Sequence, residues 1–246
     1  MAKKNRLDEV MMHQGFVSSK DEAFIMVTEG RVFVGGQKAV SPSQPVVPEV
    51  KIELRGEDQR YVGRAAHKLK GAMDRFDILA KGKVCADIGA ATGGFTEILL
   101  EYGAKKVYAI DTARGKLAVK LREDPRVVVM ERTDVRDLQK LPEPVFLITI
   151  DVSLISLRDI LQHAKRFLEP KGTIVTLFKP QYEAKKPSLL RHGIVKDEKT
   201  REKLLHAFMK WARDEKLTIM DWMESPIRGS EGNVEYLLYI TSEEKK

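Results

Sequence analysis

The sequence is poor in cysteine and has no long apolar run. Its single cysteine, Cys85, excludes an internal disulfide and a metal site built from several cysteines, and is typical of a reducing compartment. The longest apolar stretch, Val145 to Leu157, is interrupted by Asp151 and is too short to span a bilayer. The charged start of the chain, MAKKNRLDEV, has no apolar signal core, so we expect a cytoplasmic protein without a membrane partner.

Positive charge is in surplus instead. The 246 residues are 43% hydrophobic and 32% charged, as in ordinary globular proteins, and carry a net charge of +7. Residues 1–62 are neutral, so the whole surplus lies beyond them, chiefly in residues 63–83 and 179–203. Solvated helical faces would explain these stretches, and an anionic partner such as nucleic acid would explain them equally well.

The apolar pattern changes near residue 60. Two short amphipathic helices and two short strands predict a small α+β domain over residues 1–54, followed by a linker at 55–62. Strands and helices then alternate over residues 63–246, which predicts an α/β domain with a mostly parallel sheet and helices on both faces. The last two strands have no helix between them, so we expect them to pair antiparallel at one edge. The expected strands of this domain are Val84–Ile88, Lys106–Ile110, Arg126–Met130, Phe146–Asp151, Thr173–Phe178, Leu217–Glu224 and Val234–Thr241, and its expected helices include Leu157–Leu168 and Glu198–Glu215.

A glycine-rich loop follows the first strand of the larger domain, where residues 84–96 read VCADIGAATGGFT. Glycines let the backbone approach a ligand closely, and the spacing differs from the G-x-G-x-x-G of dinucleotide-binding loops. Asp111 ends the next strand, where a carboxylate accepts hydrogen bonds from ribose hydroxyls, and Asp134 follows the third strand, within reach of an adenine amino group. The pattern favours S-adenosylmethionine as the cofactor. Its expected binding residues are Asp87, Gly89, Ala90, Thr92, Gly93, Gly94, Phe95, Asp111 and Asp134.

Four charged residues stand where a core pattern would not place them. Asp151 and Lys179 follow parallel strands, and Glu235 begins the antiparallel last strand, so all three should meet at the carboxyl edge of the sheet. Lys68 lies in a helix entering the domain and shares one face with Arg64. The convergence of these groups beside the glycine-rich loop predicts an active site.

Several motifs then identify a family. RAAHKL at 64–69, DIGAATGGFT at 87–96, DVS at 151–153, FKPQ at 178–181 and SPIRGSEGNVE at 225–235 resemble those of the FtsJ-type ribose 2′-O-methyltransferases. Residues 5–52 resemble the S4 RNA-binding domain, through RLD, SSK and EGRVFVGG. Together they resemble the TlyA family, often labelled hemolysins. The resemblance implies a Rossmann-like class I methyltransferase with a seven-stranded sheet, acting on ribosomal RNA or ribosomal subunits, with Lys68, Asp151, Lys179 and Glu235 as its catalytic set.

On this interpretation Lys179 lies nearest the acceptor hydroxyl, Lys68 supplies a second cation, and the two carboxylates orient the lysines. A lysine takes the hydroxyl proton if desolvation or a neighbouring cation lowers its pKa. Each basic stretch begins beside a catalytic lysine, which favours an RNA path into the site. The expected RNA contacts are Arg6, Lys20, Arg31, Arg64, Tyr182, Lys185 and Lys186. The scattered histidines predict no metal.

Three other functions remain open at this point. A non-catalytic ribosome-binding protein would keep the S4-like domain without needing all four charges. An S4-headed pseudouridine synthase needs a catalytic aspartate in a GRLD-type motif, whereas the only RLD here, at 6–8, lies inside the S4-like segment. A membrane-lysing hemolysin would need an insertable segment, which the sequence does not contain.

Overall fold

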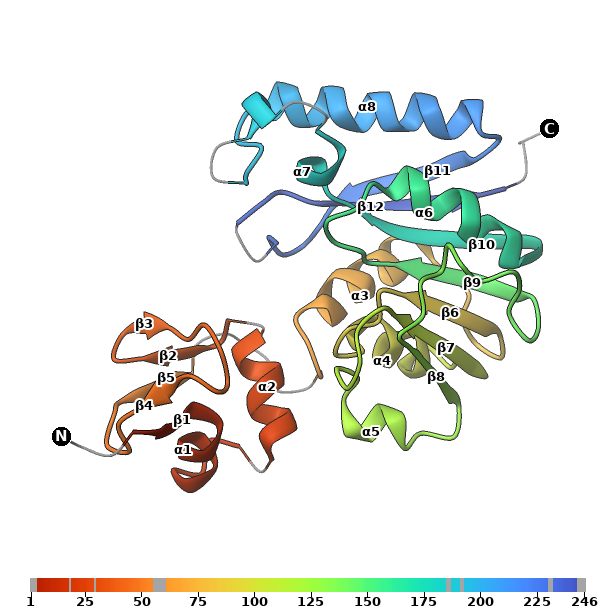
Figure 1. Ribbon diagram of the computed structural model, residues 1–246. Coiled ribbons are helices and arrows are strands. Elements are labelled where there is room, and N and C mark those ends of the chain that lie inside the picture. The colour runs from red at the N-terminus through yellow and green to blue at the C-terminus, as the bar shows by residue number, and fades with distance from the viewer. Residues whose placement is uncertain are drawn as a thin grey trace.

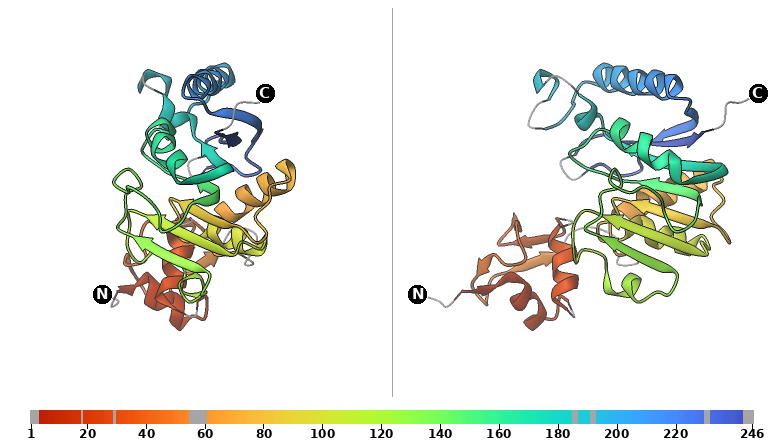
Figure 2. Two further views of the ribbon diagram at one scale, coloured as in Figure 1. Left: turned by 90° about the vertical axis from the view of Figure 1, so that its right-hand side faces the viewer. Right: turned by 45° about the vertical axis from the view of Figure 1, so that its right-hand side comes forward.

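The computed structural model describes residues 4–17, 19–28, 30–54, 61–184, 187–190, 193–229 and 232–242. Its N-terminal unit packs two helices, α1 (Leu7–His13) and α2 (Lys20–Thr28), against two small sheets. Leu7, Met11 and Val32 are fully buried in the core of this unit. Figure 1 and the right-hand view of Figure 2 show the unit beside a larger one. Its strands are β1 (Asn5–Arg6), β2 (Val32–Val34), β3 (Gln37–Lys38), β4 (Pro45–Val46) and β5 (Ile52–Leu54).

The larger unit is built on a seven-stranded sheet in the order β11-β12-β10-β9-β6-β7-β8. Strand β12 runs antiparallel to both of its neighbours, while the strands from β10 to β8 pair parallel. The expected fold class is therefore confirmed. The strands are β6 (Val84–Ile88), β7 (Lys106–Asp111), β8 (Val127–Glu131), β9 (Val145–Ile150), β10 (Leu168–Phe178), β11 (Thr218–Glu224) and β12 (Tyr236–Thr241).

Helices cover both faces of this sheet (Figure 1). Alternate residues of each buried strand point to opposite faces, so Cys85 joins one core and Ala86 the other. The first core includes α3 (Ala65–Phe76), α4 (Gly94–Glu101) and α5 (Val119–Arg122). The second includes α6 (Leu157–Ala164) and α8 (Glu198–Asp214). Burial on both faces explains why these strands read as nearly continuous apolar runs.

Two local expectations were wrong. The helix expected over Leu157–Leu168 ends at Ala164, and a short 3-10 turn, Lys165–Phe167, leads directly into β10. Strand β10 starts earlier than expected because it crosses an irregularity between Leu168 and Thr173, where the register with β9 shifts. Lys171 there has a left-handed φ of 66°, which ordinary strand patterns do not include.

Candidate active site

The carboxyl ends of the parallel strands and the start of β12 meet at one edge of the large sheet. Strand β6 ends at Ile88 and continues into the glycine-rich loop, where Gly89 and Gly93 have φ angles of 84° and 99°. A side chain at Gly89 would collide with the backbone carbonyl oxygen of Asp151, and one at Gly93 would collide with Leu121 of α5. The backbone angle favours glycine at both positions, and at Gly89 the fixed backbone of Asp151 also excludes a Cβ atom.

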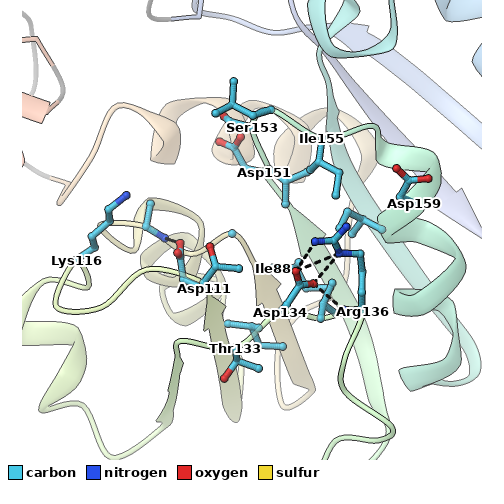
Figure 3. Close-up of a pocket in the computed structure, with 18 residues that line it drawn as sticks. Ile88, Asp111, Lys116, Thr133, Asp134, Arg136, Asp151, Ser153, Ile155 and Asp159 are labelled. Atoms are coloured by element: carbon cyan, nitrogen blue, oxygen red, sulfur yellow. Dashed lines mark hydrogen bonds and ion pairs between the residues drawn. The ribbon is translucent and has the colours of Figure 1, made fainter. Parts of the chain in front are cut away.

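Two adjoining cavities open at this edge. The larger has a volume of about 660 Å³ and extends from the loop past the ends of β7 and β9 (Figure 3). The smaller, about 180 Å³, lies between the loop, the start of α3 and Lys179. Both are lined by Gly89, Ala91, Asp151 and Ser153. The space suits a nucleoside-sized ligand with an extension toward the charged residues.

Asp111 and Asp134 line the larger cavity (Figure 3). The Asp111 carboxylate accepts the backbone N–H of Ala91 at 2.8 Å and that of Ala113 at 2.7 Å, and so fixes the loop. Each of its oxygens retains a further lone pair for a ligand. Asp134 forms an ion pair with Arg136 at 2.6 Å, and this guanidinium holds the pKa of the carboxyl below its ordinary value. A ligand at Asp134 would therefore compete with Arg136.

Asp87 lies beneath the loop, away from both cavities. Its fully buried carboxylate accepts the hydroxyls of Thr96 at 2.7 Å and Thr149 at 3.1 Å. Burial raises its pKa to about 7, an effect that the two threonine bonds oppose. The expectation of direct cofactor contact from Asp87 finds no support, and Gly93 packs against α5 instead. The other expected cofactor residues line one of the two cavities: Gly89, Ala90, Thr92, Gly94, Phe95, Asp111 and Asp134.

The four charged residues form two ion pairs. Lys68 of α3 donates to Glu235 at 2.6 Å, and Lys179 lies 2.6 Å from Asp151. Lys179 also donates to the hydroxyl of Ser153 at 3.0 Å. Both lysines and Glu235 are less than one tenth exposed. Each lysine of the set therefore has a carboxylate as its partner, which offsets part of the cost of burying it.

The ion pairs decide the protonation of Lys179. Burial lowers the pKa of its ammonium, but Asp151 and Glu235 raise it by more, and the net shift is upward. Burial likewise raises the pKa of Asp151, but Lys179 and Lys68 lower it below its ordinary value. The condition stated for a lysine that takes the hydroxyl proton, a lowered pKa, is therefore not met by Lys179 while it is paired with Asp151.

The residues expected to contact RNA are spread over several elements. Arg64 precedes α3, one turn from Lys68, and is exposed. The ring of Tyr182, in α7 (Pro180–Glu183), lies 5.9 Å from the Lys179 Nζ atom. Lys185 and Lys186 lie outside the described residues.

In the N-terminal unit, the expected RNA contacts are engaged with neighbours. Arg6 pairs with Asp8 at 2.6 Å and Lys20 with Glu9 at 2.9 Å. Arg31 is only 8% exposed, so its position gives no support to a phosphate contact. Phosphate binding by Arg6 or Lys20 would have to compete with these ion pairs.

Three residues of the site escaped the sequence analysis as individual candidates. Ser153, at the third position of the DVS motif, holds Lys179. Leu154, beside it, is 87% exposed and has a left-handed φ of 65°. Glu183 is a buried carboxylate four residues after Lys179. Backbone angle and burial single out Leu154 and Glu183, and neither property is visible in an apolar or charged sequence pattern.

Two properties of the described residues concern a membrane-spanning segment and a metal site. No helix among them is long and apolar enough to cross a membrane. No group of three or more histidine, cysteine, aspartate or glutamate side chains within the described part of the chain is placed to hold a metal ion.

Comparisons with known proteins agree with the fold and the site. Residues 61–241 match the FtsJ-like methyltransferase family and residues 5–52 match the S4 domain. These matches define an S4-headed methyltransferase and confirm that the chain is an enzyme of this class. They also remove the non-catalytic and pseudouridine synthase alternatives.

Individual relatives narrow the family assignment further. It is 37% identical to the 16S/23S rRNA (cytidine-2′-O)-methyltransferase TlyA of Mycobacterium tuberculosis (strain ATCC 25618 / H37Rv), over 99% of this chain and 92% of that protein. It is 38% identical to hemolysin A of Brachyspira hyodysenteriae, over 96% and 99% of the two chains. A solved structure described as a candidate hemolysin from Streptococcus thermophilus superposes with a TM-score of 0.74 at 34% identity, covering 98% of this chain and 89% of that one. The chain therefore belongs to the TlyA family, as its motifs predicted.

Proposed function

We propose that the protein transfers a methyl group from S-adenosylmethionine to a ribose 2′-hydroxyl of ribosomal RNA. The observation that carries this proposal is that Lys179 and Asp151, an ion pair, line the same cavity as the glycine-rich loop. A cofactor on the loop and a nucleotide at the lysine would thus meet in one space. The relative from Mycobacterium tuberculosis, named for 2′-O-methylation of cytidine in ribosomal RNA, supports the choice of acceptor.

The cofactor would be held by Asp111 and by the loop residues that line the cavities: Gly89, Ala90, Ala91, Thr92, Gly94 and Phe95. The fit rests on the bare backbone at Gly89 and on the Asp111 carboxylate, which faces a cavity of about 660 Å³ with spare acceptor capacity. Asp87 supports the loop from below as a positioning residue. When bound, S-adenosylmethionine supplies an activated methyl group and a positive charge.

Lys179 is the group that would act on the acceptor hydroxyl. Its ammonium is favoured by Asp151, and the positive charge that S-adenosylmethionine would bring to the neighbouring loop would act in the opposite direction and lower the pKa of Lys179. The neutral amine then takes the 2′-hydroxyl proton, and Asp151 stabilises the ammonium that results. Lys68, held by Glu235, presents the second positive charge to the ribose or a neighbouring phosphate.

We further propose a domain organisation in which both domains contact RNA. Residues 1–54 form the S4-like RNA-binding domain, 55–62 the linker and 63–246 the methyltransferase domain. RNA would contact Arg6 and Lys20 in the first domain, and Arg64, Tyr182, Lys185 and Lys186 in the second. Arg31 is left out of this set because its side chain is buried.

Tritiated S-adenosylmethionine tests the proposal. The substrates are ribosomal subunits from a strain of the source organism in which the gene is deleted, followed by nuclease digestion and separation of the nucleosides. We expect label in a 2′-O-methylated nucleoside. Label confined to a base or to ribosomal protein, or no incorporation by folded protein that binds the cofactor, would refute the assignment.

A further inference from the structure

A buried carboxylate next to the active site has no part in the mechanism above. The side chain of Glu183, the last residue of α7, is 3% exposed. It accepts the backbone N–H of Leu157 at 2.7 Å and both of its oxygens accept the hydroxyl of Ser156, at 3.0 and 2.9 Å. The guanidinium of Arg158 lies 3.3 Å away. All of these donors come from the start of α6.

The contacts join two segments that each carry half of an ion pair. Lys179 is the N-cap residue of α7, so only three residues separate it from Glu183. Asp151 and Ser153 lie in the loop that connects β9 to Ser156, the N-cap residue of α6. Glu183 therefore ties the end of the Lys179 segment to the end of the Asp151 segment.

We propose that Glu183 is a positioning residue that holds Lys179 against Asp151 and Ser153, a role that rests on the proposed function. With the two segments joined at Glu183, the Lys179 side chain meets Asp151 at 2.6 Å and Ser153 at 3.0 Å. Without that join, α7 is free to move away from α6 and to take Lys179 with it. A shift of about 1 Å in a reacting group is enough to slow catalysis severely.

The chemistry of the contact requires a carboxylate. Glu183 receives three kinds of donor, a backbone N–H, a hydroxyl and a guanidinium, and an ionised carboxylate only accepts. Its charge also faces the N-terminus of α6, where a negative charge is favoured. An amide of the same shape would turn an N–H₂ group toward one of these donors and leave Arg158 without its counterion.

The test compares Glu183→Gln with Asp197→Asn in the full-length protein. Asp197 is a matched control because it too caps a helix, α8, by accepting from Thr200 at 2.8 Å, and it is not among the residues lining the two cavities. We measure single-turnover methylation of the ribosomal subunits described above at saturating S-adenosylmethionine, as a function of pH. Calorimetry gives the affinity for the cofactor.

We expect Glu183→Gln to lower the maximal single-turnover rate by about 10-fold or more, the loss that follows from about 1.4 kcal/mol of lost transition-state stabilisation. Cofactor affinity should stay within about 3-fold of wild type, since Glu183 lines neither cavity. The midpoint of the pH–rate profile should move to lower pH, because weaker contact with Asp151 lowers the pKa of Lys179. Asp197→Asn should change neither the rate nor the midpoint.

A folded Glu183→Gln protein with the rate and midpoint of wild type would overturn the role of Glu183 while leaving the proposed function standing. Equal losses in rate and in cofactor affinity would also overturn it. If wild type itself does not methylate the subunits, the proposed function has failed instead. Should Glu183→Gln not fold, Ser156→Ala removes one donor from Glu183, and the same test then expects about a 3-fold lower rate and the same direction of midpoint shift.

Discussion

Lys179 combines three structural properties. It is buried, it is paired with Asp151, and it lines the cavity beside the glycine-rich loop. Burial alone would favour the neutral amine, and the carboxylate favours the ammonium. With Asp151 in contact the net shift of the Lys179 pKa is upward, so the charges around Lys179 have to change before it can act as a base.

Replacing Lys179 tests its role directly. Lys179→Ala should reduce single-turnover methylation by at least about 100-fold, the range that general-base catalysis contributes. Cofactor binding should persist, because the lysine acts on the acceptor. Lys179→Arg should not restore the rate, since a guanidinium keeps its proton at neutral pH. Rates near wild type for Lys179→Ala would show that the four charged residues form an RNA-binding surface and not a catalytic site.

Asp111 should control cofactor affinity. Its carboxylate orders the loop through Ala91 and Ala113, so Asp111→Ala should weaken S-adenosylmethionine binding by about 1–3 kcal/mol. Asp124→Ala is the control, because Asp124 also accepts a backbone N–H, from Arg126 at 2.9 Å, and lies outside both cavities. Calorimetry showing equal affinities for the two variants would contradict the assignment of the larger cavity.

Asp87 should make stability depend on pH. Its folded pKa, about 7, lies above the ordinary value of 3.8, so folding takes up a proton between the two. The stability due to this proton is complete below about pH 4 and is lost as pH rises through about 7. The melting temperature of Asp87→Asn relative to wild type should therefore rise by at least about 3 °C between pH 5 and pH 8. A difference that does not change with pH would refute this.

At the scale of the element, the glycine-rich loop is set by collisions as well as by backbone angles. Gly89 and Gly82 have similar φ angles, 84° and 72°, but a Cβ at Gly89 meets Asp151 whereas one at Gly82 meets nothing within 4 Å. Gly82→Ala should cost about 1 kcal/mol of stability. Gly89→Ala should cost at least about 2 kcal/mol more and abolish cofactor binding. Urea unfolding and calorimetry compare them, and equal costs would show that the collision relaxes.

A comparison of the elements shows which parts of the fold sequence patterns can predict. The central strands of the large sheet, such as β6 and β9, were predictable because both of their faces are buried, so apolar residues mark them throughout. The two-residue strands β1, β3 and β4 were not predictable, since no apolar run distinguishes them from loops. The topology predicted from the sequence also placed Asp151, Lys179 and Glu235 at one edge of the sheet, which is where the structure has them. Which lysine pairs with which carboxylate depends on the path of α3, and strand patterns do not contain that path.

At the scale of the whole molecule, the two units have separate cores. Buried residues from Leu7 to Ile52 form one core and those from Val62 onward form the other two, while the partly buried Ile25 of α2 packs against one of the latter. Removing residues 1–54 should therefore leave S-adenosylmethionine affinity within about 3-fold of wild type. Methylation of intact subunits should fall at least about 10-fold, because the deletion removes the RNA contacts proposed for the first unit. An unchanged rate on intact subunits would show that the S4-like domain does not recognise the substrate.

The order of strands across the sheet has a consequence for when the enzyme becomes active during its synthesis. Strand β12 follows all the other strands in the chain, yet it lies between β10 and β11. A growing chain that has not yet released β12 from the ribosome has neither a continuous sheet nor Glu235, the partner of Lys68. If the proposed mechanism holds, nascent copies, which are held beside ribosomal RNA while they are made, would stay inactive until nearly the whole domain has emerged.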